Sequence, residues 1–163
     1  MTTTLHRALV HSSAAELERV ARRFAANPNL HLLLPDPEPG ADPGERTWAR
    51  LADEDGVEVW LISWPERAAT GWHDHGGSVG AFAVARGAVV EEIFDGRDVR
   101  RRRLGEGDSR AFGEHHVHNV VGVAEGRSLT VHAYAPRLET MTSYVLGDTG
   151  LVPTGTTSER EDW

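Results

Sequence analysis

Histidines are the residues of this sequence with the clearest potential for chemistry, nine in a chain of 163 residues. The segment His73-Asp74-His75 places two imidazoles at positions i and i+2, which lie on the same face of an extended chain. Glycines 71, 76, 77 and 80 surround the pair and would let the backbone crowd a site. A third imidazole from a neighbouring strand would complete a facial set of metal ligands, so we expect a metal site here.

A second histidine cluster, Glu114-His115-His116-Val117-His118-Asn119, could supply that third ligand. On a strand His115 shares a face with Val117 and Asn119, whereas His116 shares the opposite face with His118. Spacing alone does not choose between the two faces.

The composition excludes several other classes of protein. The chain has no Cys, which rules out disulfide frameworks, Cys-ligated metals and thiolate nucleophiles. All 17 basic residues are Arg, so no Lys is present for Schiff-base chemistry. A net charge of -8 makes nucleic acid and anionic membranes poor partners. The run from Arg100 to Arg103 is therefore expected to be a solvated strand edge.

No targeting segment is recognisable in the sequence. Residues 1–9 lack a basic start followed by an apolar run, and the longest aliphatic cluster, Leu32 to Leu34, is too short to span a bilayer. We expect a cytoplasmic protein that acts as a monomer or a small homo-oligomer.

The elements that must position these histidines form one domain over residues 1–163. A helical segment at about 12–27 is predicted because Ser13 and Glu16 make a capping-box pair. The helix has one apolar face, formed by Leu17, Val20, Ala21 and Phe24.

Short strand-forming runs follow, and they predict a β-barrel at about 46–147. They cover residues 57–62, 80–86, 88–94, 99–104, 110–112, 117–123, 129–135 and 141–146, with Gly-containing turns between them. Short antiparallel strands at this spacing are typical of an all-β sandwich or small barrel. The polar C-terminal tail from Pro153 to Trp163 is expected to be loosely held, although Trp163 could dock on the barrel.

Two motifs resemble those of the cupins. The segment GWHDHGGSVGAFAVARG is similar to the first cupin motif, and the H-x-V-x-N pattern that begins at His115 is similar to the second. The resemblance implies a cupin-type small β-barrel (double-stranded β-helix or jelly roll). In cupins the His that begins H-x-x-x-N is the ligand, so the resemblance implies metal ligands His73, His75 and His115. His116 and His118 are left without a role.

One departure from the cupin pattern indicates which branch of the cupins the chain resembles. Cupins normally carry a Glu three or four residues after H-x-H, whereas this chain has Val79 and Gly80 there. Three neutral imidazoles leave the double charge of the metal uncompensated, which suits an anionic ligand such as a thiolate. From about Trp48 to Tyr144 the chain resembles the cysteine dioxygenases, in which three His hold Fe(II). Bacterial-type members are more similar, because Gly80 stands where mammalian members carry a Cys that crosslinks to Tyr.

The resemblance also implies catalytic and substrate-binding residues. The strand Thr130-Val131-His132-Ala133-Tyr134-Ala135-Pro136 resembles the family pattern S-x-H-x-Y-[SA]-P. Under it His132 fixes the Tyr134 hydroxyl, which can hydrogen-bond to dioxygen or substrate, and Thr130 takes the Ser place. Arg50 resembles the Arg that clamps the substrate carboxylate, a task that suits the planar guanidinium fork. Arg46 is the competing candidate.

The expected function is oxidation of a small thiol, with L-cysteine favoured, to its sulfinate by O2 at an Fe(II) centre. Two alternatives remain open. The first is a dioxygenase for mercaptopropionate or another thiol acid, although related mercaptopropionate enzymes have a Gln that resembles the Arg50 position. The second is a cupin module that binds a small anion without chemistry, against which His132 and Tyr134 argue.

Overall fold

Helix α1 (Ala14–Ala25) begins the computed structural model, which describes residues 12–36 and 39–158. The Ser13 hydroxyl accepts from the backbone N–H of Glu16 at 3.3 Å, and the Ser13 N–H donates to the Glu16 carboxylate at 2.7 Å. The predicted capping box is therefore confirmed. The 3-10 helix η1 (Leu30–Leu33) follows. Neither helix is long and apolar enough to cross a membrane, and no other helix is found among the described residues.

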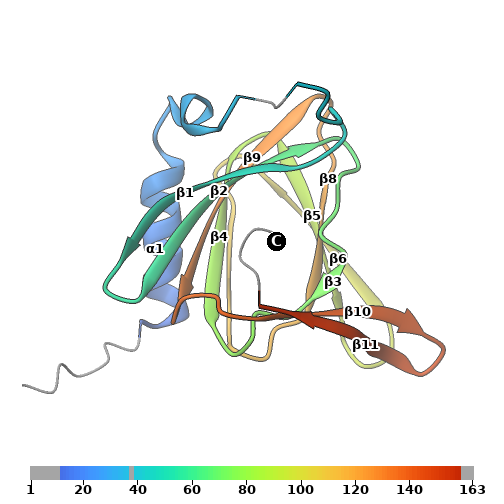
Figure 1. Ribbon diagram of the computed structural model, residues 1–163. Coiled ribbons are helices and arrows are strands. Elements are labelled where there is room, and N and C mark those ends of the chain that lie inside the picture. Colours follow the sequence, from blue (N-terminus) through green and yellow to red (C-terminus); the bar gives the residue numbers. More distant parts are fainter. Residues whose placement is uncertain (1–11, 37–38, 159–163) are drawn as a thin grey trace, which may run out of the picture.

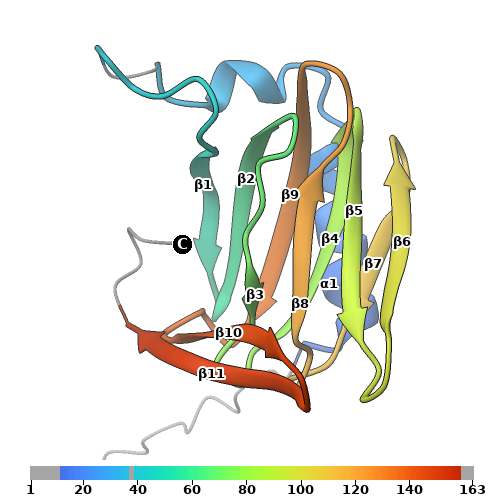
Figure 2. The same ribbon diagram turned by 90° about the vertical axis from the view of Figure 1, so that its right-hand side faces the viewer.

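Two antiparallel sheets form the body of the molecule (Figures 1 and 2). The five-stranded sheet has the order β1 (Thr47–Glu54), β2 (Val57–Pro65), β9 (Arg127–Ala135), β4 (Val79–Arg86) and β7 (Ser109–Phe112). The six-stranded sheet has the order β11 (Gly150–Thr157), β10 (Met141–Gly147), β3 (Trp72–His73), β8 (His118–Gly122), β5 (Ala88–Phe94) and β6 (Val99–Gly105). This architecture confirms the predicted all-β class.

The C-terminal segment differs from its prediction. The tail is predicted to be loosely held from Pro153 onward, but residues up to Thr157 belong to β11, which pairs with β10 from Met141↔Thr157 to Gly147↔Gly150. Pro153 hid this strand in the sequence, because proline lacks the N–H that a central strand needs. Here Pro153 is tolerated because β11 lies at the edge of its sheet, next to an irregularity in the register. Residues after 158, including Trp163, lie outside the described part of the chain.

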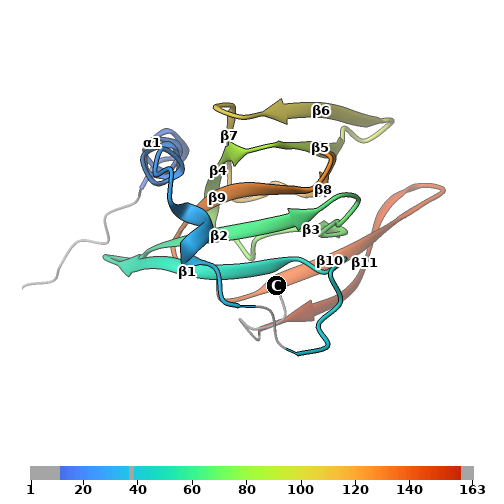
Figure 3. The same cartoon turned by 90° about the horizontal axis from the view of Figure 1, so that it is seen from above.

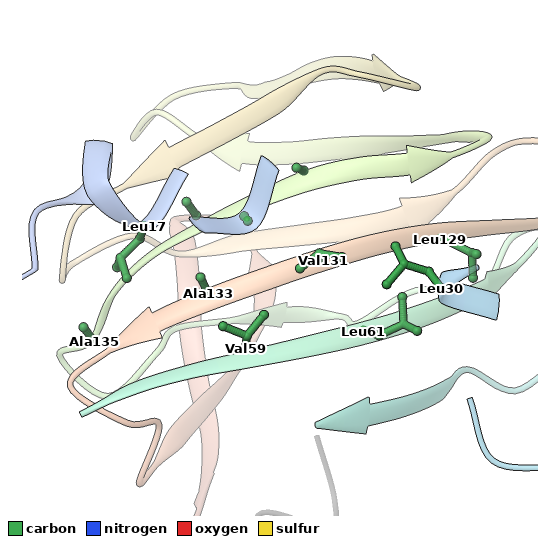
Figure 4. Packing of buried hydrophobic residues seen from close by; sticks show 11 residues of the cluster. Leu17, Leu30, Val59, Leu61, Leu129, Val131, Ala133 and Ala135 are labelled. Carbon is green, nitrogen blue, oxygen red and sulfur yellow. The ribbon is translucent and has the colours of Figure 1, made fainter. Parts of the chain in front are cut away.

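Strand β9 lies in the middle of the five-stranded sheet, and both faces of this sheet are covered. On the outer face α1 and η1 pack against β2, β4 and β9 through an aliphatic cluster shown in Figure 4. Figure 3 shows α1 on this outer side, away from β10 and β11. On the inner face a second cluster, which includes Trp64, Phe82 and Tyr134, fills the space between the sheets. The predicted apolar face of α1 is confirmed, since Leu17 and Ala21 are fully buried in the outer cluster.

The arginine run from Arg100 to Arg103 lies exposed on β6, at the edge of the six-stranded sheet. Arg100 pairs with Asp95 and Arg101 pairs with Glu92, each at 2.7 Å. The prediction of a solvated edge strand is confirmed.

Candidate metal centre

Three buried imidazoles meet between the sheets. His73 ends β3, His75 follows it in the next turn, and His118 begins β8 as the direct cross-strand neighbour of His73. One ring nitrogen of each lies within 4.8 Å of the others, a separation at which one ion could contact all three. Their exposed fractions are 5%, 1% and 1%. The structure therefore brings together the predicted His73-x-His75 pair and a third histidine.

The third histidine is His118 and not His115, so the prediction of His115 as a ligand is corrected. His115 lies in the turn before β8, and its side chain is 92% exposed beside Glu114. The sequence was ambiguous because His-x-Val occurs twice, as His115-His116-Val117 and as His118-Asn119-Val120. The pairing of β8 with β3 selects the second copy, and this long-range register is not visible in the local sequence.

The hydrogen bonds around the triad leave nitrogens free for a metal. His73 Nδ1 lies 3.0 Å from the carbonyl oxygen of Gly71, and His118 Nδ1 lies 2.9 Å from the Glu91 carboxylate. Both partners are acceptors, so each Nδ1 carries the proton and each Nε2 keeps its lone pair. Both ring nitrogens of His75 are buried without a hydrogen-bond partner among residues 12–36 and 39–158. Orphaned buried polar atoms are costly, and coordination of a divalent ion would satisfy one of these two nitrogens.

Burial also keeps these rings in the neutral, metal-binding form. It lowers the pKa of His73 to about 3, assisted by the neighbouring His118. Burial is likewise the main cause that lowers the pKa of His75 and of His118. At neutral pH the three imidazoles are therefore uncharged, with one nitrogen of each ring free of a proton, as coordination requires.

No carboxylate completes this group among the residues the structure describes. Beside it, Phe112 stacks on His75 with ring centroids 4.7 Å apart. A Cβ at Gly80 would lie 2.4 Å from the Phe112 ring and 2.9 Å from Tyr134. Glycine is thus required at position 80, where the ring fills the space that a side chain would occupy.

A hydrogen-bonded relay runs along β9 next to the triad. The indole N–H of Trp64 donates to Thr130 Oγ1 at 2.7 Å, and Thr130 Oγ1 lies 2.8 Å from His132 Nε2. His132 Nδ1 in turn lies 3.1 Å from the Tyr134 hydroxyl. In one consistent set of directions, Thr130 donates to His132 and His132 donates to Tyr134. The hydroxyl proton of Tyr134 is then free to form a hydrogen bond in the space between the sheets. The predicted contact of His132 with Tyr134 is present.

Tyr134 remains protonated at neutral pH. Burial raises the pKa of its hydroxyl, and the opposing charge of Arg46 offsets only part of this effect. The side chain is therefore a hydrogen-bond donor and not a phenolate.

Residues of both the triad and the relay line one cavity of about 50 Å³. Two members of the triad, His73 and His118, line it together with His132 and Tyr134. The rest of the wall is mostly apolar and consists of Trp48, Trp60, Ile62, Thr70, Val120, Leu138 and Met141. A ligand in this cavity would have to be small and would face both the imidazoles and the tyrosine.

Comparison with known protein families shows which family the chain belongs to. A family model for cysteine dioxygenase type I matches residues 10–146. The chain belongs to the cysteine dioxygenase type I family. No curated protein matches it at a significant level.

Solved structures show that this cysteine dioxygenase family member has a cupin fold. It is similar to KdgF from Halomonas sp., with a TM-score of 0.52 and 24% identity over 64% of this chain and 87% of that chain. It is also similar to an oxalate oxidase, with a TM-score of 0.56 and 13% identity over 72% of this chain and 66% of that chain. A third similar structure is a sugar phosphate isomerase of the cupin superfamily from Silicibacter pomeroyi. Its TM-score is 0.50, with 21% identity over 67% of this chain and 75% of that chain. Family and triad together indicate a metal-dependent dioxygenase of cupin fold.

Arg50, the predicted carboxylate anchor of this cysteine dioxygenase family member, does not line the cavity. Its guanidinium lies 3.4 Å from Asp53 and 3.9 Å from Glu58, and it covers the ring of Trp60. Its side chain is 45% exposed. Arg50 is therefore already paired with carboxylates of the protein.

Arg46, the competing candidate, does not line the cavity either, but its charge acts on three residues that do, His73, His132 and Tyr134. Its guanidinium covers the Trp64 ring at 5.3 Å, and no carboxylate of the described residues pairs with it. Burial lowers the pKa of Arg46, and its charge contributes, after burial, to the lowered pKa values of His73 and His132. Among the described residues, Arg46 is thus a cation without a carboxylate partner whose charge acts on His73.

Glu91 is a site residue that the sequence interpretation missed. It is fully buried on β5, in contact with His118. Burial raises its pKa, but the hydrogen bonds from His116 and His118 outweigh this effect and hold the pKa low. A signal was present, because Glu91 occupies the same strand face as Val89 and Ile93. An acid on an apolar face needs a buried partner.

Proposed function

We propose that this protein oxidises a small thiol acid, with L-cysteine the favoured substrate, to its sulfinate with O2 at Fe(II) held by His73, His75 and His118. The observation that carries the proposal is the set of three buried, neutral imidazoles, which no carboxylate of the described residues joins, beside a small cavity that Tyr134 lines. Family membership supports iron as the metal.

The charge of the site favours a thiolate. Fe(II), when bound, supplies open coordination positions at which a thiolate and dioxygen can react, and it lowers the pKa of the thiol. The three histidines contribute no negative charge, so an anionic substrate balances the metal. The overall reaction, thiolate plus O2 to sulfinate, places both oxygen atoms on sulfur and needs no external reductant.

Residues of β9 position the reactants. Tyr134 donates its hydroxyl hydrogen bond into the cavity, where dioxygen and the substrate meet. His132 orients that hydroxyl, and Thr130 fixes the tautomer of His132. Holding the reactants in one orientation removes much of the entropic barrier.

Arg46 is the proposed anchor for the substrate carboxylate. It is partly buried, has no carboxylate partner among the described residues, and acts electrostatically on His73, His132 and Tyr134. Arg50 would first have to leave Asp53 and Glu58 to take this role. A bidentate contact from an arginine would select substrates that carry a carboxylate.

The test is anaerobic reconstitution with Fe(II) followed by oxygen-uptake measurements with a panel of thiols. The panel contains cysteine, mercaptopropionate and cysteamine, which respectively carry both polar groups, only the carboxylate and only the amine. We expect uptake with cysteine and a product heavier by two oxygen atoms. Uptake with mercaptopropionate alone would reassign the substrate. Tight thiol binding without oxygen uptake would instead favour a non-enzymatic binding module.

A further inference from the structure

Glu91 lies at the centre of a buried polar cluster that contacts the imidazole triad through His118. Its side chain is 0% exposed, and three groups from different parts of the chain donate to it. His118 Nδ1 and His116 Nε2 each lie 2.9 Å from Oε1, and Arg110 Nε lies 3.0 Å from Oε2. Both carboxylate oxygens are therefore occupied.

The cluster is held from several sides. Arg110 belongs to β7 of the five-stranded sheet, whereas Glu91 and His118 belong to β5 and β8 of the other sheet. His116 is clamped by stacking on Phe112, with ring centroids 4.7 Å apart and planes 18° from parallel. Glu91 thus joins the two sheets at the level of the triad.

We propose that Glu91 is a positioning residue, which holds His118 with Nδ1 protonated and so directs Nε2 towards the metal. The inference rests on the proposed metal site. A carboxylate behind a metal-binding histidine fixes the ring tautomer and orientation and raises the basicity of the coordinating nitrogen. Arg110 and His116 keep the carboxylate itself in place.

Glu91, His116 and His118 also lie close enough to hold an ion of their own, but other contacts argue against this. Arg110 brings a positive charge against the Glu91 carboxylate, which opposes a cation there. The Nδ1 of His118 already donates to Glu91, so it has no lone pair for a second metal. The cluster therefore supports the triad and does not compete with it.

The variant that tests this role is Glu91→Gln, with Glu92→Gln as the matched control. Glu92 is the next residue on β5, and its carboxylate instead contacts Arg101 and Asn119. Co(II) affinity of the full chain is measured by competition with a chelator, without any thiol. We expect Glu91→Gln to weaken Co(II) binding by about 10- to 100-fold, the usual effect of losing such a partner. Glu92→Gln should bind as the wild type does, and Glu91→Asp should retain part of the affinity.

A second measurement is made on the wild type and needs a variant only for assignment. Long-range proton–nitrogen NMR on the metal-free wild type reports which nitrogen of His118 carries the proton, with His118→Gln used for assignment. We expect the proton on Nδ1. A proton on Nε2 would overturn the inference.

The outcomes separate this inference from the proposed function. If the wild type binds Co(II) and Glu91→Gln binds it equally well, the role of Glu91 is wrong while the metal site stands. If Co(II) binding depends on Glu91 but no thiol is oxidised, the role of Glu91 stands and the dioxygenase proposal fails. A wild type that binds no Co(II) would overturn both.

Discussion

A centre of three neutral imidazoles leaves the charge of a divalent metal to be balanced by the substrate. Here those imidazoles are His73, His75 and His118, and the two nitrogens of His75 have no hydrogen-bond partner in the described part of the chain. An apolar cavity wall raises the strength of each electrostatic contact inside it. These residues make an anionic, metal-coordinating substrate the natural occupant of the cavity.

The identity of the third ligand gives a direct test. Replacing His118 by Gln should abolish stoichiometric metal binding, because it removes one of three nitrogens that lie within 4.8 Å of one another. Replacing the exposed His115 by Gln should leave binding unchanged. Metal content is measured by elemental analysis after reconstitution and gel filtration. Loss of metal in the His115 variant, with retention in the His118 variant, would contradict the structure.

The two arginines give a second test. Arg46→Gln should raise KM for cysteine by about 10- to 100-fold, because a hydrogen bond to a charged group is worth about 1.5–3 kcal/mol. Arg50→Gln should have a smaller effect, since Arg50 contacts Asp53 and Glu58 outside the cavity lining. Steady-state oxygen uptake over a range of cysteine concentrations measures both. A larger increase for Arg50 would return the anchor role to that residue.

Strand pairing explains why some elements could be predicted and others could not. The capping box and apolar face of α1 and the alternation of apolar and polar residues in β9 are local signals, and both elements form as expected. β11 was hidden by Pro153, and its pairing with β10 is set by an edge position that is not encoded locally. In the same way, His73-x-His75 was recognisable from spacing, whereas the choice of His118 depends on the contact between β3 and β8.

The turn between β5 and β6 provides a test of pH dependence. Asp95 accepts from the backbone N–H of Asp98 at 2.8 Å and of Arg97 at 3.0 Å, and it pairs with Arg100. The hydrogen bond from Asp98 is the main cause that lowers the pKa of Asp95 from 3.8 to about 2. A lowered pKa stabilises the fold above pH 3.8, and this contribution is lost as the pH falls from 3.8 towards 2.

Asp95→Asn should therefore be less stable than the wild type near neutral pH, with a difference that narrows below about pH 4. Urea unfolding of both proteins between pH 6 and pH 3 measures the difference. A gap that stays constant down to pH 3 would show that Asp95 titrates normally in the folded protein.

In the whole molecule, the two faces of the five-stranded sheet have different roles. The five-stranded sheet is buried on its outer face by α1 and η1, and its inner face carries the relay of Thr130, His132 and Tyr134. The six-stranded sheet contributes His73 and His118 from the opposite side. Closing the two sheets together thus assembles the reactive groups around a cavity of about 50 Å³.

The central claim, that both atoms of dioxygen are transferred to the sulfur of a thiol, is tested most directly by isotope labelling. The Fe(II)-loaded protein is supplied with cysteine and ¹⁸O2, and the product is analysed by mass spectrometry. The account predicts a sulfinate that carries two ¹⁸O atoms, formed by the wild type and not by His118→Gln. A product with one labelled oxygen, or a disulfide with none, would contradict it.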